Sequence, residues 1–236
     1  MGGMISGGFW SLARTAACLK RRNGSRKALP ALLFFTDPER TPDPAAAARA
    51  LPPGSGIVFR AFGAPDAQVG GVRLAALARS HGLVLLVGAD AGLAARVGAK
   101  GVHLPERLAH QARRIKAARP RWLVTAAAHS VRAARLALAH GADAVVVSPV
   151  FPSASASAGR PLGPVRLALM VRGINGPAFG LGGVTNKTAR RLKDAGLVGL
   201  AAVGGLATAG QNLKAVSSRT RGAPSAGVSG RGVARG

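Results

Sequence analysis

Two histidines are the residues best suited to acid–base chemistry, because each follows a short apolar run that is typical of a strand. An imidazole titrates near neutral pH and can therefore accept and donate a proton in one reaction. His129 lies in the segment Ala128–Ser130 and is the stronger candidate for a catalytic role. His103 lies between Val102 and Leu104, and these apolar neighbours favour a structural, hydrogen-bonded histidine.

Two glycine pairs could hold a phosphate group. Gly182-Gly183 and Gly204-Gly205 each follow an apolar run. Glycine has no Cβ, so the backbone N–H groups of such a pair can approach an anion closely. An ordinary tight turn would also explain one isolated pair. Two pairs after consecutive strands favour a shared phosphate site.

Short apolar runs divide the middle of the chain, and segments with helical spacing separate them. Runs that are apolar throughout are typical of strands buried on both faces of a parallel sheet. The predicted strands are Ala31–Thr36, Gly56–Ala61, Leu83–Val87, Gly101–Leu104, Trp122–Ala127, Ala144–Ser148, Ala178–Leu181 and Val198–Val203. The predicted helices are Pro44–Leu51, Asp66–His81, Gly92–Val97, Arg107–Ala118, Val131–His140, Pro164–Arg172 and Lys187–Ala195.

This alternation of strands and helices predicts an α/β protein, a (β/α)8 TIM barrel, with a doubly wound open sheet as the alternative. In such a barrel the functional residues lie at the carboxyl ends of the strands. Arg60 lies near the carboxyl end of a predicted strand, and Ser153, His129 and both glycine pairs follow predicted strands. We therefore expect these residues to lie together at one rim.

The chain has a formal net charge of +25, because its 33 Lys and Arg residues outnumber its 8 Asp and Glu residues. Such a charge is typical of proteins with anionic partners, including nucleic acids. Nucleic-acid binding is disfavoured here, because no aromatic residues alternate with the basic ones to stack on bases. An anionic metabolite is the better prediction.

Both ends of the chain are basic and free of acidic residues. Because neither end shows a periodic apolar face, we expect residues 1–29 to form a disordered basic leader and 209–236 a disordered basic tail. The barrel is expected over residues 30–208. The single cysteine, Cys18, excludes a disulfide within the chain. No window is apolar and long enough to span a membrane, so we expect a cytoplasmic protein.

Several segments together resemble the thiamine phosphate synthase/TenI family over about residues 30–206. The matching segments, in the family's order and spacing, are Leu32–Asp37 (LLFFTD), Gly56–Arg60 (GIVFR), Gly98–Leu104 (GAKGVHL), Ala128–Ser130 (AHS), Gly141–Asp143 (GAD), Pro149–Ser153 (PVFPS), Gly163, Gly180–Val184 (GLGGV) and Gly199–Ala202 (GLAA). Individually most of these segments are common, but collectively they are specific. The resemblance implies a (β/α)8 barrel.

The sequence departs from the family's pattern where the resemblance implies a magnesium–diphosphate site. Gly88-Ala89 stand where the pattern has Asn-Asp, and Glu106 follows His103 without the usual Asp. The Arg-Glu-Lys motif reads Arg60-Ala61-Phe62, and the loop Ser153–Ala156 lacks its Lys. Departure of a diphosphate requires a bound metal ion and several Lys or Arg side chains, whereas binding of a single phosphate group requires fewer positive charges.

The resemblance therefore implies a thiamine-biosynthesis enzyme that acts on thiazole phosphate, with a TenI-like thiazole tautomerase (an isomerase) favoured. One alternative is an active thiamine phosphate synthase, a transferase that would need Mg²⁺. A non-catalytic binder of thiazole phosphate or thiamine phosphate is another alternative. The sequence is also compatible with a homodimer. We expect no metal ligands. The expected catalytic residue is His129, and the expected substrate- or phosphate-binding residues are Arg60, Ser153, Gly163, Gly182, Gly183, Gly204 and Gly205.

Overall fold

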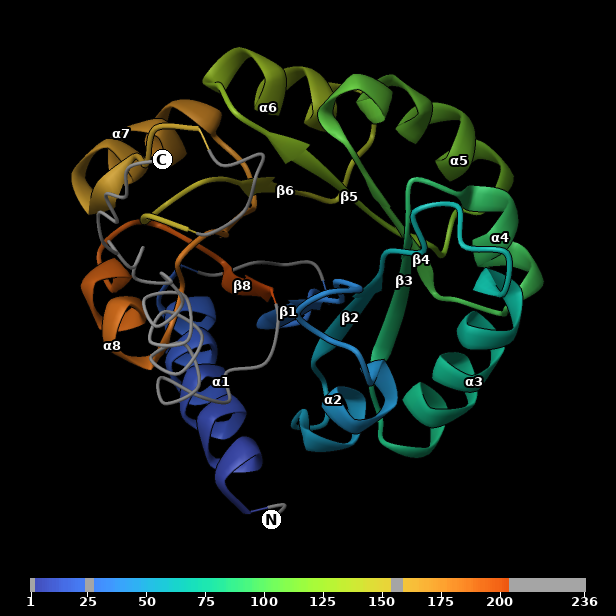
Figure 1. Cartoon of the computed structure of the whole chain (residues 1–236). Coiled ribbons are helices and arrows are strands. Elements are labelled where there is room, and N and C mark those ends of the chain that lie inside the picture. Colours follow the sequence, from blue (N-terminus) through green and yellow to red (C-terminus); the bar gives the residue numbers. More distant parts are fainter. Residues whose placement is uncertain (1–2, 24–27, 154–158, 204–236) are drawn as a thin grey trace, which may run out of the picture. The chain divides into compact units, whose positions relative to one another are not determined.

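The computed structural model describes residues 3–23, 28–153 and 159–203, which belong to one compact unit. Its centre is a closed barrel of parallel strands in the order β1 to β8, with helices around it (Figure 1). The strands are β1 (Leu32–Phe35), β2 (Gly56–Phe59), β3 (Val84–Gly88), β4 (Gly101–Leu104), β5 (Leu123–Ala128), β6 (Ala144–Val147), β7 (Ala178–Gly180) and β8 (Gly199–Val203). The prediction of a TIM barrel is confirmed, and the open-sheet alternative is wrong.

Helical segments separate the strands in each place where the sequence predicts one. They are α2 (Pro44–Ala50), α3 (Ala67–Ser80), α4 (Ala91–Arg96), η1 (Glu106–Gln111), α5 (Ala112–Ala118), α6 (Val131–Ala139), α7 (Gly163–Ile174), α8 (Asn186–Ala189) and η2 (Arg190–Leu192). The predicted helix Arg107–Ala118 divides into a 3-10 turn and α5. Gly98 follows α4 with φ of +71°, a conformation that glycine adopts without steric cost.

Apolar side chains fill two shells. The inner shell lies within the barrel, where alternate residues of the strands point inward. It includes Leu33, Phe35, Val58, Val146 and Phe179, all buried. A larger shell packs between the outer faces of the strands and the helices.

The segment expected to be a disordered leader instead forms the helix α1 (Gly3–Asn23), so that expectation is wrong for these residues. Phe9, Leu12, Ala16 and Leu19 recur at helical spacing and are almost completely buried. Phe9 meets Phe34 of β1 edge to face, with ring centroids 5.3 Å apart. The apolar stripe is present in the sequence, but the glycines and basic residues around it make it inconspicuous.

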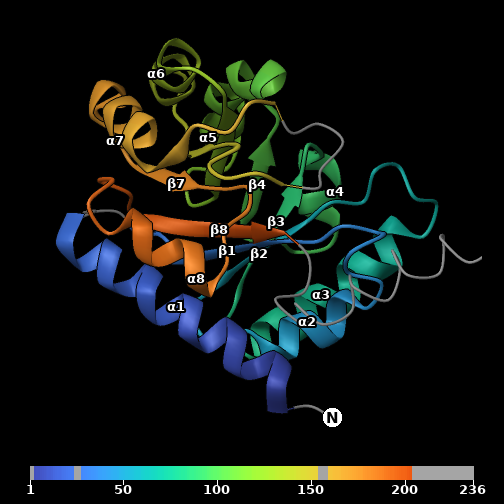
Figure 2. The same ribbon diagram turned by 60° about the vertical axis from the view of Figure 1, so that its left-hand side comes forward.

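Helix α1 runs along the outside of the seam where β1 pairs with β8 (Figure 2). It contacts α8 on one side and α2 on the other. Polar contacts fix its end: Arg22 forms an ion pair of 3.0 Å with Asp194, and Asn23 Nδ2 donates to the Leu197 carbonyl at 2.8 Å. In a (β/α)8 barrel the helix after β8 ordinarily covers this seam. Residues 209–236, with the expected tail, lie outside the described residues.

Among the described residues, we find no helix with the length and apolar character that a membrane crossing requires.

Candidate functional site

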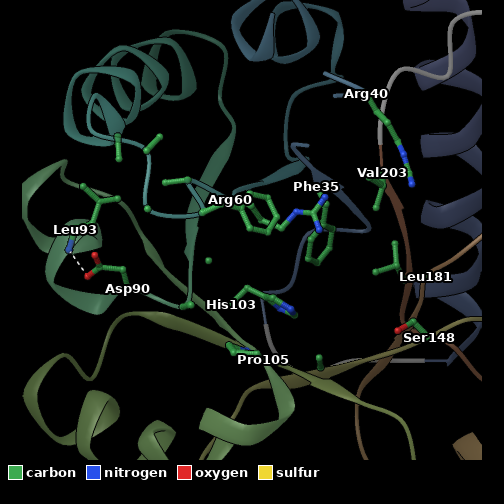
Figure 3. A pocket seen from close by; sticks show the side chains of 18 of the residues that line it. Phe35, Arg40, Arg60, Asp90, Leu93, His103, Pro105, Ser148, Leu181 and Val203 are labelled. Carbon is green, nitrogen blue, oxygen red and sulfur yellow. Dashed lines mark hydrogen bonds between the residues drawn. The ribbon is translucent and has the colours of Figure 1, made fainter. Parts of the chain in front are cut away.

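A cavity of about 930 Å³ opens at the carboxyl ends of the strands, where the barrel architecture predicts the site (Figure 3). Arg60, His129, Ser153 and Gly182 line it, so the fold brings these four sequence-predicted residues together. Gly163 and Gly183 are absent from the lining. Gly204 and Gly205 lie outside the described residues.

Arg60 follows β2 and is held by the loop after β1. Its Nε donates to the Thr36 carbonyl at 2.6 Å, and one terminal nitrogen lies 2.9 Å from Asp37 Oδ2. Its backbone N–H donates to Thr36 Oγ1 at 3.0 Å. Burial lowers the pKa of the guanidinium, and the Asp37 carboxylate opposes that shift. Arg60 is thus a cation of fixed orientation in the pocket wall.

His129 follows β5 and is paired with Glu106, a residue two positions beyond β4. Glu106 Oε2 lies 2.8 Å from His129 Nδ1 and accepts a hydrogen bond of 2.7 Å from the His129 backbone N–H. When Nδ1 carries the proton for this contact, Nε2 is left as the base. Ser130 then caps α6 by accepting from the Ala133 N–H at 3.1 Å.

The pairing of Glu106 with His129 is a feature that sequence reasoning missed. Glu106 stood out only as an acid near an expected metal position. β4 pairs with β5 in the register Leu104 to Ala126, and this pairing brings Glu106, which follows β4, next to His129, which follows β5. The register belongs to the tertiary structure and could not be read from the sequence.

His103 points into the barrel from β4 and is buried, as its apolar neighbours predict. Its Nδ1 lies 3.0 Å from Thr125 Oγ1, and its ring meets Phe35 edge to face with centroids 4.8 Å apart. It also lines the cavity. Burial, and secondly the Arg60 charge, lower the pKa of His103 from its ordinary 6.5 to about 3. His103 is therefore neutral at physiological pH.

This neutral histidine predicts a pH-dependent stability. Between about pH 6.5 and pH 3, His103 is protonated in the unfolded chain but neutral in the folded chain. The free energy of unfolding should therefore fall by roughly 1 kcal/mol for each unit by which the pH is lowered across that window. Denaturant titrations at several pH values measure this slope. The slope should flatten in His103→Asn and stay unchanged in His110→Asn, an exposed control. Equal slopes in all three proteins would contradict the assignment.

Gly182 and Gly183 follow β7, with φ of +98° and +60°. In the described part of the chain, the N–H of neither glycine donates a hydrogen bond, so both could bind an anion. A Cβ on Gly183, however, would lie 2.5 Å from the Pro152 carbonyl oxygen and 2.7 Å from Phe151 Cβ. A larger residue at position 183 would thus disturb the packing of two loops rather than fill a space for phosphate.

Gly163 begins α7 and donates from its N–H to the Val150 carbonyl at 2.8 Å. It has φ of +70°, and a Cβ there would meet open space. Its left-handed backbone lies at the turn into α7.

The acidic residues near the pocket do not form a site that fits Mg²⁺, which prefers several oxygen ligands in octahedral geometry. Asp90 accepts from the Leu93 N–H at 2.7 Å and caps α4 (Figure 3). Glu106 is engaged by His129, and Asp37 by Arg60. Gly88 and Ala89 offer no side-chain ligand. Among the described residues, no three His, Cys, Asp or Glu side chains lie close enough together to hold a metal.

Comparison with known proteins identifies the family. The model of the family described as "Thiamine monophosphate synthase" matches residues 32–206. A relative from Aquifex aeolicus, named "Putative thiamine-phosphate synthase 2", is 31% identical over 128 residues, which cover 54% of this chain and 68% of that protein. The "Thiamine-phosphate synthase" of Geobacillus thermodenitrificans is 32% identical over 139 residues, with 58% of this chain and 62% of that protein covered.

Among solved structures, a thiamine phosphate pyrophosphorylase from Pyrococcus furiosus is similar with a TM-score of 0.61 and 23% identity. The similarity covers 80% of this chain and 87% of that one, and it supports the barrel fold. The family model covers most of the barrel, including β1 to β8 and the pocket between their ends. The chain therefore belongs to the thiamine monophosphate synthase family.

Proposed function

We propose that this protein binds thiazole phosphate at the mouth of the barrel and catalyses a metal-independent proton transfer on it, as a TenI-like tautomerase does. The observation that carries the proposal is the His129–Glu106 pair at the pocket rim, with 2.8 Å between Nδ1 and Oε2. A tautomerisation removes a proton from one atom of the ring system and returns one to another. A single imidazole can perform both transfers.

The contacts of His129 suit that task. The Glu106 carboxylate orients the imidazole through Nδ1, which leaves Nε2 as the nitrogen that exchanges a proton with the ligand. The side chain of His129 is about half exposed, at 56%, and it lines the cavity, so a ligand can reach it. A tautomerisation has no leaving group, and the proposal therefore needs neither Mg²⁺ nor a diphosphate clamp.

The phosphate of the ligand is assigned to the rim after β7. Gly182 lines the cavity, and its N–H and that of Gly183 donate no hydrogen bond within the described residues. Ser153 lies in the same lining. Arg60 lies in the same lining and contributes positive charge while it stays paired with Asp37. Backbone N–H groups and one nearby cation are a common set for a phosphate monoester.

The second candidate is an active synthase that couples hydroxymethylpyrimidine diphosphate to thiazole phosphate. The printed names of the relatives favour it. The engaged carboxylates of Asp90 and Glu106 argue against it, because departure of pyrophosphate requires a metal or several free cations.

Product analysis distinguishes these candidates. The protein is incubated with the thiazole phosphate tautomers, with and without the pyrimidine diphosphate and Mg²⁺, and each reaction is repeated in EDTA. We expect interconversion of the tautomers at the same rate in EDTA. EDTA-sensitive formation of thiamine phosphate would instead establish the synthase and direct attention to Asp90 and Glu106 as ligands. Binding of thiazole phosphate without turnover under any condition would establish a non-catalytic binder.

A further inference from the structure

Side chains from three strands and their loops form a continuous column in the pocket wall. His103 meets Phe35 edge to face at 4.8 Å, and the Arg60 guanidinium lies over Phe35 at 5.9 Å from the ring centroid. The same guanidinium also lies over Phe62, 5.0 Å from the ring centroid. Figure 3 shows His103, Phe35 and Arg60 gathered at the centre of the pocket. Phe62 is thus the outermost ring of the column.

Phe62 has two features that packing does not explain. It lines the cavity, yet it is 67% exposed, which leaves much of an apolar ring in contact with water. Its φ is +49°, a left-handed conformation that costs free energy for a bulky residue. Strained residues of this kind persist mainly where the side chain has a function.

We propose that Phe62 is a specificity-determining residue that stacks on a flat ring of the ligand. The Arg60 cation holds one face of the phenyl group, and Asp37 and Thr36 hold Arg60 in turn. The exposed part of the ring remains for the ligand, and aromatic pairs gain from offset or edge contacts. Phe62 stands where the family's pattern has Lys. A side chain that would pair with an anionic group of the ligand is therefore replaced by one that stacks on an aromatic ring.

The selected ligands are accordingly flat heteroaromatic compounds that carry one phosphate, rather than compounds recognised mainly through a diphosphate. Phe62 lies in the pocket of the proposed function. Only the identification of the stacked ring as a thiazole rests on that proposed function. The stacking role of Phe62 can be tested with phosphates that are not substrates of the family.

The experiment compares benzyl phosphate with ethyl phosphate by titration calorimetry, because the two share a monoester and differ in the ring. The wild-type protein should bind benzyl phosphate more tightly. Phe62→Leu should reduce that preference by roughly three- to tenfold, the range expected for one aromatic contact, and Phe62→Tyr should retain it. Leu169→Ala on α7, another exposed apolar position, should change neither affinity.

A second measurement separates this role from a structural one. Phe62→Gly relieves the positive φ, so its melting temperature should equal or exceed that of the wild type while the ring preference is lost. A marked drop in melting temperature would overturn the inference, as would a wild type without ring preference. Equal weakening of both ligands in Phe62→Leu would also overturn it, since Phe62 would then act only by positioning Arg60. Absence of tautomerase activity, with ring preference intact, would refute the proposed function alone.

Discussion

Replacement of His129 by alanine is expected to lower kcat/KM for thiazole phosphate by about two to four orders of magnitude, the usual contribution of a positioned acid–base group. The variant should keep the wild-type melting temperature, because the side chain is about half exposed at 56% and packs little. Steady-state kinetics on the two tautomers measures the loss.

Two companion variants sharpen this test. Glu106→Ala should give a smaller but clear loss, because the imidazole remains while its orientation through Nδ1 is lost. His110→Ala, at an exposed position outside the pocket lining, should be fully active. Full activity in His129→Ala would remove His129 as the catalytic residue. His103 would then be the next candidate, as the other histidine in the lining.

Deletion of residues 1–23 is expected to abolish the stable barrel. Phe9, Leu12 and Leu19 are almost completely buried, and their removal uncovers the seam between β1 and β8. Truncation of one such buried side chain typically costs about 2–5 kcal/mol, and a whole domain is stable by only about 5–15 kcal/mol. Circular dichroism during heating should show no cooperative transition in the shortened chain.

Point variants isolate the contribution of single residues in α1. Leu12→Ala should lower the free energy of unfolding by about 2–5 kcal/mol, whereas Trp10→Ala, at a half-exposed position on the same helix, should cost far less. A cooperative transition at the wild-type temperature in the shortened chain would show that α1 is dispensable.

The order of elements could be predicted from the sequence because it depends on local patterns. The runs that became β1 to β8 are short and largely apolar, a pattern typical of strands buried between helices and a barrel interior. The position of the pocket followed, since parallel strands present their carboxyl ends at one rim. The hydrogen-bonded state of His103 was also expected, from its apolar neighbours Val102 and Leu104.

Other features depend on partners that are distant in the sequence, and only the tertiary structure decided them. Helix α1 was missed because a basic, glycine-rich segment gains its helical stability from packing against β1 and β8 rather than from its own propensity. Glu106 and His129 are 23 positions apart and meet because β4 and β5 are neighbours.

The glycine pair after β7 shows why residue type alone could not separate ligand binding from packing. The N–H of Gly183 donates no hydrogen bond within the described residues, yet the nearest atoms to its missing Cβ belong to Phe151 and Pro152. Likewise the sequence predicts Arg60 as a phosphate-binding residue but does not show its partners. In the structure Thr36, Asp37 and two phenyl rings hold its guanidinium in the wall of the pocket. The sequence by itself determined the order of the strands whose carboxyl ends form the rim, and contacts between loops decided which of the residues after those strands line the pocket.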